Sequence, residues 1–334
     1  MSQKYELNLL VDYLCFTIKL DNLTIENTSK LCLRDWLEIV LHLGCGSVDY
    51  VGKKAFYGYE ESWNKNGITY CFGGRDDVFV QFSGSGCRFW ETINLEYTWQ
   101  QYIAELRSNF KSLHFSRLDI ACDSFGLLDI KKMQIATIKQ QYISRWKIYL
   151  VSQGNRENSI MFGSPTSDFR LRIYDKSLER IESGVDSETV PINWVRCEFQ
   201  MRNDAGKSFI DSWLKLGDIG KTYCGIMRNQ LRYWTNYDGK NADRMVLKPW
   251  WKTFLGDAEQ IKMAYQGGLD YNLESLEKYV YNQAGSSIRT LIELQGGDIT
   301  RLIGNVSVRP LNERQKELLS KSDYIDLADK YSFR

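Results

Sequence analysis

Histidine is almost absent from this sequence, which has only His42 and His114 among its 334 residues. Two such isolated histidines exclude an H-E-x-x-H zinc motif and a paired-histidine metal site, and they leave little room for a Ser-His-Asp triad. The eight cysteines are scattered, and no two have the C-x-x-C spacing of a zinc or redox site. A metal ion would therefore be held by carboxylate oxygens, which are the ligands that Mg²⁺ and Mn²⁺ prefer.

Long apolar runs are also missing. A membrane-spanning helix needs roughly 20 consecutive apolar residues, and even the most apolar early stretch, residues 9–20, is interrupted by Asp12 and Lys19. The first residues show no basic patch followed by an apolar core, so no secretory signal is predicted. We therefore expect a cytoplasmic protein with reduced cysteines and no membrane partner.

Net charge is nearly zero, because 43 Lys and Arg oppose 42 Asp and Glu. This total argues against a simple polybasic nucleic-acid-binding protein. The distribution is uneven, however: residues 101–252 carry 24 basic and 17 acidic side chains, whereas residues 1–100 carry 9 and 13. Any contact with nucleic acid is therefore expected in the middle of the chain.

The pattern of apolar residues predicts an α+β fold, with an antiparallel sheet followed by a mainly helical region. Strands are predicted at residues 9–20, 55–59, 68–72, 78–82, 113–122, 159–162, 169–175 and 195–201. Helices are predicted at residues 29–42, 97–110, 129–146, 207–216, 223–234, 250–266, 273–282, 286–294 and 312–320. We divide the chain into an α+β domain at 1–205, a basic and aromatic region at 206–260 packed on it, and a helical C-terminal region at 261–334.

Three of the predicted strands carry charged side chains on one face, which is unusual because a core sheet prefers apolar alternation. Side chains alternate between the two faces of a strand, so one face of 116–123 is polar while Leu118, Ile120 and Cys122 point into the core. The polar positions of the three strands are Arg117, Asp119 and Asp123; Arg170, Arg172, Tyr174 and Lys176; and Arg196, Glu198, Gln200 and Arg202. Asp12 adds a further carboxylate in the first strand.

This pattern has two interpretations. The first is a solvated sheet face that carries cross-strand ion pairs. The second is a site for phosphodiester chemistry, in which carboxylates hold a divalent cation and arginines clamp phosphate. A tyrosine beside those cations would have its phenolate favoured and could act as a nucleophile.

The polar segments resemble the replication initiation factor family, which includes Gram-positive rolling-circle plasmid initiators and related relaxases of conjugative elements and phages. The residues that carry the resemblance are Phe115-Ser-Arg-Leu-Asp-Ile-Ala-Cys-Asp123, Phe162-Gly, Arg170-Leu-Arg-Ile-Tyr-Asp-Lys-Ser-Leu-Glu-Arg180 and Trp194-Val-Arg-Cys-Glu-Phe-Gln-Met-Arg202. Weaker agreement covers Val11-Asp12-Tyr13 and Ser83-Gly-Ser-Gly-Cys-Arg88.

The resemblance implies a divergent form of the antiparallel-sheet nicking domain. It places Tyr174 at the family's nucleophile, so that Tyr174 would attack one phosphodiester of an origin. The products would be a 5′-phosphotyrosyl link and a free 3′-OH that primes synthesis. It also implies a Mg²⁺ or Mn²⁺ cofactor, double-stranded origin DNA with an extruded or single-stranded nick site, a homodimer and a host helicase as partner.

The expected site residues fall into three groups. Arg172 and Lys176 would contact the phosphate beside Tyr174, and the expected metal ligands are Asp12, Asp119, Asp123 and Glu198. Arg117, Arg170, Arg180 and Arg196 would contact DNA near the site. A basic and aromatic segment at residues 221–252 is the candidate for origin recognition, with Arg228, Arg232, Arg244 and Lys248 as its DNA-binding residues.

Two other functions stay open at this stage. A non-enzymatic origin- or operator-binding protein could use the same basic face without cleaving DNA. A tyrosine recombinase also uses Arg and Tyr, but it needs no metal and normally relies on further histidines in a helical catalytic domain.

Overall fold

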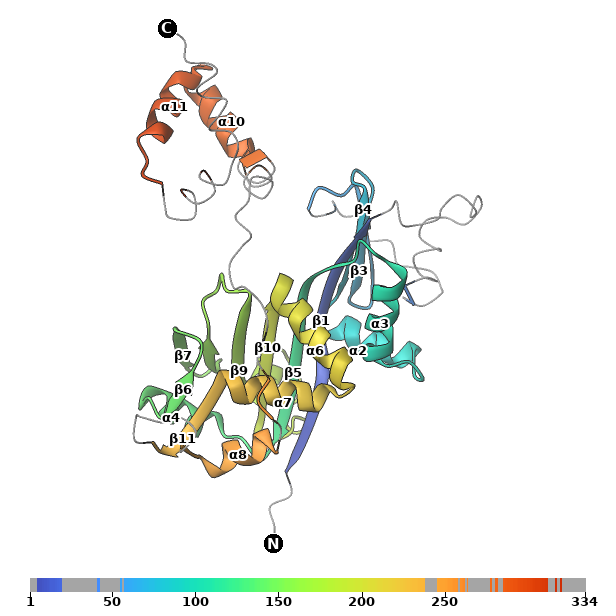
Figure 1. Ribbon diagram of the computed structural model, residues 1–334, viewed down its shortest axis with the longest axis vertical. Coiled ribbons are helices and arrows are strands. Elements are labelled where there is room, and N and C mark those ends of the chain that lie inside the picture. The colour runs from blue at the N-terminus through green and yellow to red at the C-terminus, as the bar shows by residue number, and fades with distance from the viewer. Residues whose placement is uncertain are drawn as a thin grey trace. The chain divides into compact units, whose positions relative to one another are not determined.

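A nine-stranded antiparallel sheet dominates the computed structural model (Figure 1). The structure describes residues 5–19, 41–42, 55, 57–237, 245–257, 259–261, 263, 277, 280–281, 285–311, 316 and 319. The chain divides into two compact units, residues 1–267 and 268–334, and the sheet belongs to the first. This arrangement confirms the predicted α+β class.

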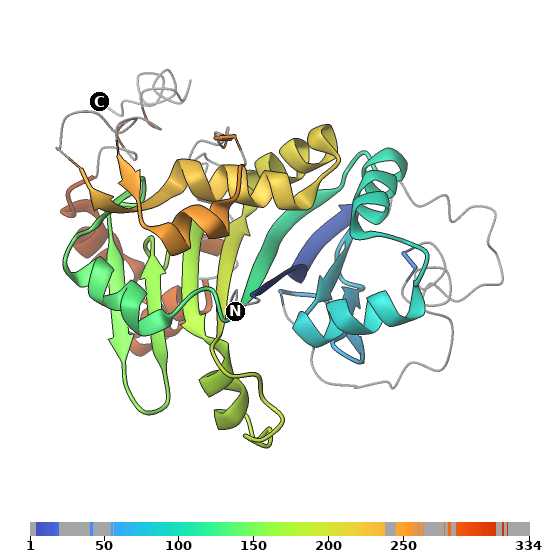
Figure 2. The ribbon, with the colours of Figure 1, turned by 90° about the horizontal axis from the view of Figure 1, so that it is seen from below.

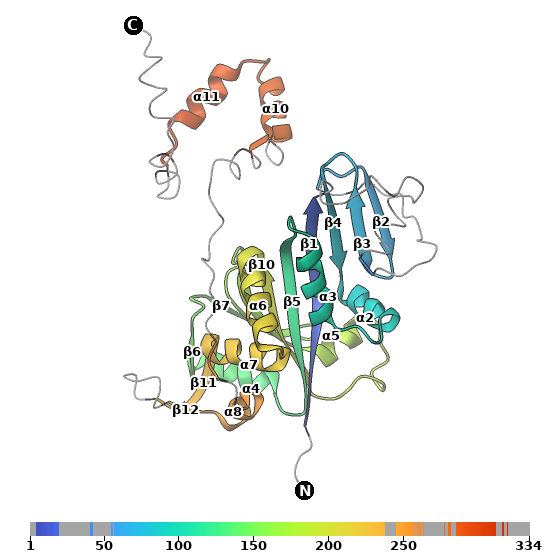
Figure 3. The same cartoon turned by 45° about the vertical axis from the view of Figure 1, so that its right-hand side comes forward.

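The order of the strands places β5 at the centre of the sheet (Figure 3). From edge to edge, the sheet runs β2 (Glu61–Lys65), β3 (Ile68–Phe72), β4 (Asp77–Phe82), β1 (Glu6–Lys19), β5 (His114–Phe125), β10 (Trp194–Arg202), β9 (Phe169–Asp175), β8 (Asn158–Phe162) and β7 (Tyr149–Gln153). Three shorter strands, β6 (Tyr142–Ser144), β11 (Leu231–Asn236) and β12 (Val246–Leu247), form a second, small sheet.

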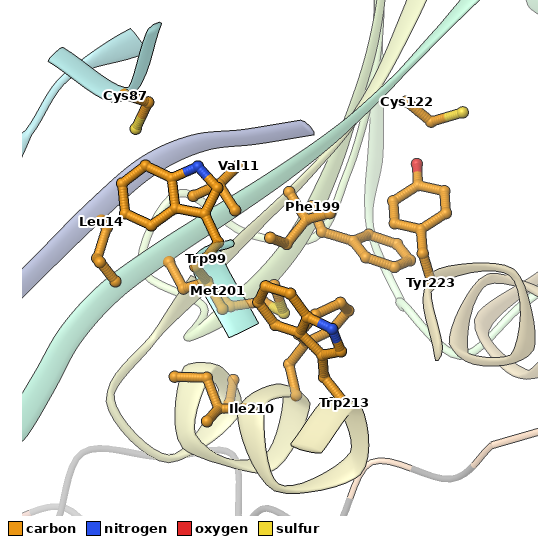
Figure 4. Close-up of a cluster of buried hydrophobic side chains, with 14 of the residues drawn as sticks. Val11, Leu14, Cys87, Trp99, Cys122, Phe199, Met201, Ile210, Trp213 and Tyr223 are labelled. Atoms are coloured by element: carbon orange, nitrogen blue, oxygen red, sulfur yellow. The ribbon is translucent and has the colours of Figure 1, made fainter. Parts of the chain in front are cut away.

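Helices cover mainly one face of the large sheet (Figure 2). They are α2 (Gly84–Ile93), α3 (Trp99–Asn109), α4 (Ile130–Ile138), α6 (Asn203–Leu216), α7 (Ile219–Gln230) and α8 (Pro249–Leu255). Alternate strand residues such as Leu118 and Phe199 point toward these helices and join one continuous core. Figure 4 shows Phe199, Trp213 and Tyr223 meeting in this core. We call this side the helix face.

The opposite side of the sheet carries the polar side chains of β1, β5, β9 and β10, and we call it the polar face. Helix α5 (Lys176–Glu182) follows β9 directly. The Asp175 carboxylate accepts a hydrogen bond of 2.9 Å from the backbone N–H of Leu178, which caps this helix. The cap turns the chain immediately after Tyr174 and so fixes Lys176 beside it.

A β-bulge in β1 changes which residues face the helices. The pairing of β1 with β5 shifts between Val11 and Tyr13. Val11 and Leu14 both belong to the core, so the two residues between them, Asp12 and Tyr13, are displaced from it together. A regular strand would have placed only one of these two side chains on the polar face.

Most strand predictions are confirmed, and the differences have local causes. The helix predicted at 129–146 ends at Ile138, because Gln140 has a positive φ of 54° and the chain then enters β6. The helix predicted at 223–234 ends at Gln230 and continues as β11. The helix predicted at 250–266 ends at Leu255, before Gly256. The strand predicted at 55–59 contains a turn in which Tyr57 and Gly58 have positive φ.

The Ser83–Arg88 segment, part of the weaker resemblance, forms the N-cap and first turn of α2. The helices predicted at 29–42, 273–282 and 312–320 lie largely outside the described residues. The second unit contains α10 (Gly285–Leu294) and α11 (Ile299–Ser307). Among the residues that the structure describes, no helix is long and apolar enough to cross a membrane.

Candidate active site

Asp119 lies near the middle of the polar face and is held by a neighbour on its own strand. Its carboxylate accepts hydrogen bonds from Nε and Nη2 of Arg117, at 3.1 and 2.6 Å. The Asp119 residue is only 2% exposed. Burial, together with the nearby charges of Glu198 and Asp12, raises the pKa of Asp119 to about 7, although Arg117 acts in the opposite direction. This carboxyl therefore changes charge near neutral pH.

Arg196 holds two other carboxylates. Its Nε and Nη2 donate to the two oxygens of Asp123, at 2.7 and 2.8 Å, and its Nη1 donates to Oδ1 of Asp12 at 2.9 Å. Arg196 and Asp123 are directly opposite in the β10–β5 register, and both are buried. The bulge in β1 brings Asp12 to the same guanidinium. Arg196 is thus occupied by carboxylates and is not free to hold phosphate in this arrangement.

Tyr174 projects from β9 beside Glu198 of the neighbouring strand. The Tyr174 hydroxyl donates a long hydrogen bond of 3.5 Å to Oε2 of Glu198. The other Glu198 oxygen accepts a hydrogen bond of 2.6 Å from Nε2 of Gln200, whose Oε1 accepts one of 2.6 Å from Nε of Arg170. The four side chains form a connected polar chain that orients the Glu198 carboxylate.

Two cations flank the Tyr174 ring. The Arg172 guanidinium lies 4.3 Å from the ring centre and the Lys176 ammonium 5.6 Å from it. Arg172 also pairs with Glu157 at 3.4 Å, and Lys176 pairs with Glu179. These side chains surround the phenol, which leaves Tyr174 only 4% exposed.

The expectation that these cations favour the phenolate is wrong for the protein without DNA. Burial, and next the charge of Glu198, raise the pKa of Tyr174 well above its usual value, and the opposing effects of Arg196 and Arg172 are smaller. The phenol is therefore protonated at neutral pH, so a nucleophilic role for Tyr174 would require removal of this proton.

The expected metal ligands converge only partly. In the part of the chain that the structure describes, no three or more His, Cys, Asp and Glu side chains are placed to hold a metal ion as they stand. Both oxygens of Asp123 are engaged by Arg196. Asp12, Asp119 and Glu198 nevertheless lie close enough together that the charges of Asp12 and Glu198 raise the pKa of Asp119. Their oxygen donors fit the chemistry of Mg²⁺ or Mn²⁺.

The remaining predicted DNA-binding residues lie in several places. Arg180 is exposed on α5, whereas Arg228 and Arg232, on α7 and β11, are half-buried. Because Tyr223 of α7 stacks near Phe199 on the helix face, with ring centres 4.6 Å apart, α7 lies across the sheet from Tyr174. Lys248 directly precedes α8, and Arg244 lies outside the described residues.

Three polar residues contribute to the site without having been predicted as site residues. Gln200 holds both Glu198 and Arg170, Glu157 pairs with Arg172, and the Tyr13 ring lies 4.3 Å below the Arg117 guanidinium. The two-residue period of the strand already placed Gln200 on the polar face, so the sequence could have indicated Gln200 as a site residue. The sequence could not have indicated Tyr13, because only the bulge in β1 places Tyr13 on the polar face.

Comparison with known proteins finds a matching family, a related sequence and a related structure. The family described as replication initiation factor matches residues 113–306. The putative DNA relaxase NicK of Bacillus subtilis (strain 168) is 27% identical over 287 residues, which cover 77% of this chain and 76% of that protein. The solved structure of a rolling circle replication initiator protein from Geobacillus stearothermophilus has 25% sequence identity and a TM-score of 0.59, and the match covers 77% of this chain and 99% of that one. This chain belongs to the replication initiation factor family.

Proposed function

We propose that this protein is an origin-specific DNA nickase and strand transferase with Tyr174 as its nucleophile. One observation carries the proposal: the Tyr174 hydroxyl lies 3.5 Å from a buried Glu198 carboxylate, and two cations flank its ring. The names of the two relatives, a relaxase and a rolling-circle initiator, support the same reaction. DNA of a replication or transfer origin is the proposed substrate, with the nick site single-stranded or extruded from the duplex.

The proposed reaction exchanges one phosphate ester for another. The Tyr174 oxygen bonds to phosphorus while the bond from phosphorus to the 3′ oxygen breaks, and the phenolic proton is transferred in the end to the released 3′ oxygen, which becomes the free 3′-OH. Arg172 and Lys176 would neutralise charge on the phosphate oxygens during this exchange. The bond energy is kept in the phosphotyrosyl link, so a later 3′-OH can reverse the step and reclose a strand.

A divalent cation is part of the proposal. Asp12, Asp119 and Glu198 would hold Mg²⁺ or Mn²⁺, which would polarise the non-bridging phosphate oxygens. Arg117 would then release Asp119 and become available to DNA phosphate. Asp123 has a positioning role, since its two hydrogen bonds fix the direction of the Arg196 side chain.

The family resemblance extends the proposal to partners. We infer a homodimer and recruitment of a host helicase, because a nicked origin must be unwound before its strand can be copied. Residues 261–334, the predicted helical C-terminal region, are the candidates for these contacts.

The test is formation of a covalent adduct with a single-stranded origin oligonucleotide in the presence of Mg²⁺ or Mn²⁺. Wild-type protein should give a covalent species that survives denaturation. Tyr174→Phe or EDTA should reduce the amount of this species about 10³-fold or more, which is the order of magnitude expected for loss of a nucleophile. Tyr149→Phe, which alters a partly exposed tyrosine on β7, is the matched control and should retain the adduct.

Full adduct formation by Tyr174→Phe would show that another residue is the nucleophile. If the wild-type protein binds origin DNA tightly but leaves every strand intact, the non-enzymatic origin-binding protein becomes the better description. Activity that persists in EDTA would instead favour a metal-independent tyrosine recombinase.

A further inference from the structure

Two cavities of the first unit lie away from Tyr174, and they differ in charge. One, of about 340 Å³, opens between α3, the start of β5 and α6; its lining includes Asp204, and its Arg107 is paired with Asp211 at 2.6 Å. The other, of about 240 Å³, opens between α4 and α8. Its lining consists of Lys132, Ile135, Ala136, Lys139, Gln141, Lys248 and Trp250, without any carboxylate. We call this second cavity the lysine groove.

The lysines of this groove come from distant parts of the sequence. Lys132 and Lys139 are seven residues apart, which places them on the same side of α4 and its C-terminal cap. Lys248 joins them from the residue before α8. Among the described residues, Lys132 has one ion pair, with Asp129 at 3.5 Å, and the two side chains are 73% and 44% exposed. Such an ion pair contributes little to stability, and another anion can easily replace the Asp129 carboxylate.

The floor and wall of the groove are apolar and partly exposed. Ile135 lies between the lysines and is 51% exposed, although it belongs to a helix whose other side is in the core. The Trp250 ring is half-buried and packs 5.2 Å from the buried Tyr233, which holds it in place. A rigid aromatic ring beside several ammonium groups suits contact with sugars and phosphates.

The groove lies on the helix face. Ile130 and Met133 of α4 pack into the core with Ile160 and Phe162, whereas Tyr174 is on the other side of the sheet. A DNA segment in the groove therefore cannot be the segment that Tyr174 cleaves. It must be DNA that continues past the nick site, and lysine contacts of this kind need no particular base sequence.

We propose that the lysine groove binds the phosphate backbone of the duplex DNA that flanks the nick site. This inference rests on the proposed function for the origin of the DNA, but the contact itself requires no cleavage. It separates duplex anchoring on the helix face from strand cleavage on the polar face. It also brings α4, which the sequence did not indicate as a DNA-binding element, into the DNA interface together with Lys248.

The test is duplex binding by the full chain in EDTA, measured over a range of salt concentrations, so that nicking cannot contribute. Lys132→Ala/Lys139→Ala should weaken binding about tenfold near physiological salt and reduce the slope of log K against log salt by nearly two, since each lost phosphate contact contributes about 0.9. Lys132→Arg/Lys139→Arg should retain the slope. Lys131→Ala, on the same helix but outside the groove, is the matched control.

An unchanged affinity and slope for Lys132→Ala/Lys139→Ala, in protein with an unchanged melting temperature, would overturn the proposal. The proposal would also be overturned if the double variant lost binding only to single-stranded oligonucleotides. The same holds if it lost binding only to an acidic peptide used in place of DNA. Because the assay contains no metal, these outcomes do not depend on whether Tyr174 cleaves DNA.

Discussion

At the scale of single residues, two arginines of the polar face have defined carboxylate partners. Arg117 holds Asp119, and Arg196 holds Asp123 and Asp12. Buried pairs of this kind cost desolvation energy, so they are weak evidence for added stability and better evidence for fixed geometry. We infer that the chain keeps Arg196 chiefly to set the position of Asp12 beside Asp119 and Glu198.

The titration of Asp119 gives a prediction for stability. Its pKa is raised from 3.8 to about 7 in the folded protein, so between about pH 4 and 7 the folded state holds a proton that the unfolded state has lost. The contribution of Asp119 to the free energy of unfolding is therefore fully present below pH 4 and falls as the pH rises to 7, by at most about 1.4 kcal/mol per pH unit.

Urea unfolding of the metal-free protein between pH 4.5 and 7.5 measures this effect. Asp119→Asn cannot titrate, so its free energy of unfolding should improve relative to wild type as the pH rises. Asp76→Asn removes a carboxylate whose side chain is 80% exposed and serves as the control. A difference between Asp119→Asn and wild type that stays constant across this range would contradict the assignment.

At the scale of elements, helix α2 is fixed against the β2–β3 turn by the absence of a side chain at Gly86. A Cβ there would lie 2.3 Å from the Gly67 carbonyl oxygen and 2.6 Å from its carbon. The neighbouring Gly84 is also close to the site, since a Cβ on it would lie 3.3 Å from Oδ1 of Asp12. The packing of α2 therefore bears on the position of a proposed metal ligand.

Gly86→Ala should push α2 away from the turn and lower the free energy of unfolding by about 1–3 kcal/mol, the usual cost of overpacking. It should also reduce adduct formation, because α2 lies beside Asp12 and its displacement would disturb the position of that carboxylate. Gly154→Ala is the control, since its nearest neighbour would lie at an ordinary 3.7 Å, and it should change stability by less than about 0.5 kcal/mol. Equal unfolding midpoints for Gly86→Ala and wild type would refute this account.

The elements also show what the sequence could and could not predict. Alternation in β5, β9 and β10 identified the polar face correctly, because a two-residue period assigns side chains to faces without knowledge of strand order. It could not predict that Arg196 binds Asp123, since that contact depends on the pairing of strands more than 70 residues apart. It also could not predict the bulge at Asp12, which changes the facing of two adjacent residues.

At the scale of the whole molecule, the proposed catalytic site belongs to the first of the two units. The Tyr174 site, the lysine groove and the continuous core all belong to residues 1–267. In the second unit, α11 leaves one row of apolar side chains, Ile299, Ile303 and Val306, more than half exposed. The core that holds the polar face together is made of residues of the first unit.

A shortened chain that ends at Gly267 should consequently fold and cleave DNA. We expect its melting temperature to lie within about 4 °C of the full chain, which corresponds to roughly 1–2 kcal/mol in a unit of this size. It should also form the covalent adduct with a short single-stranded oligonucleotide at a comparable rate. Calorimetry and denaturing gels test the two statements, and Tyr174→Phe in the shortened chain is the negative control. A shortened chain without a cooperative transition would show that residues 268–334 are needed for folding.

The central position of β5 has a consequence for the synthesis of the protein. Its two neighbours are β1, made about 100 residues earlier, and β10, made about 70 residues later. Closing such long loops is slow compared with forming the local β2–β3–β4 meander. A chain synthesised only as far as β9 has Tyr174 but lacks Glu198 and Arg196, which β10 supplies. A chain terminated before β10 would therefore lack the proposed nicking site, whereas a chain that ends at Gly267 would contain it.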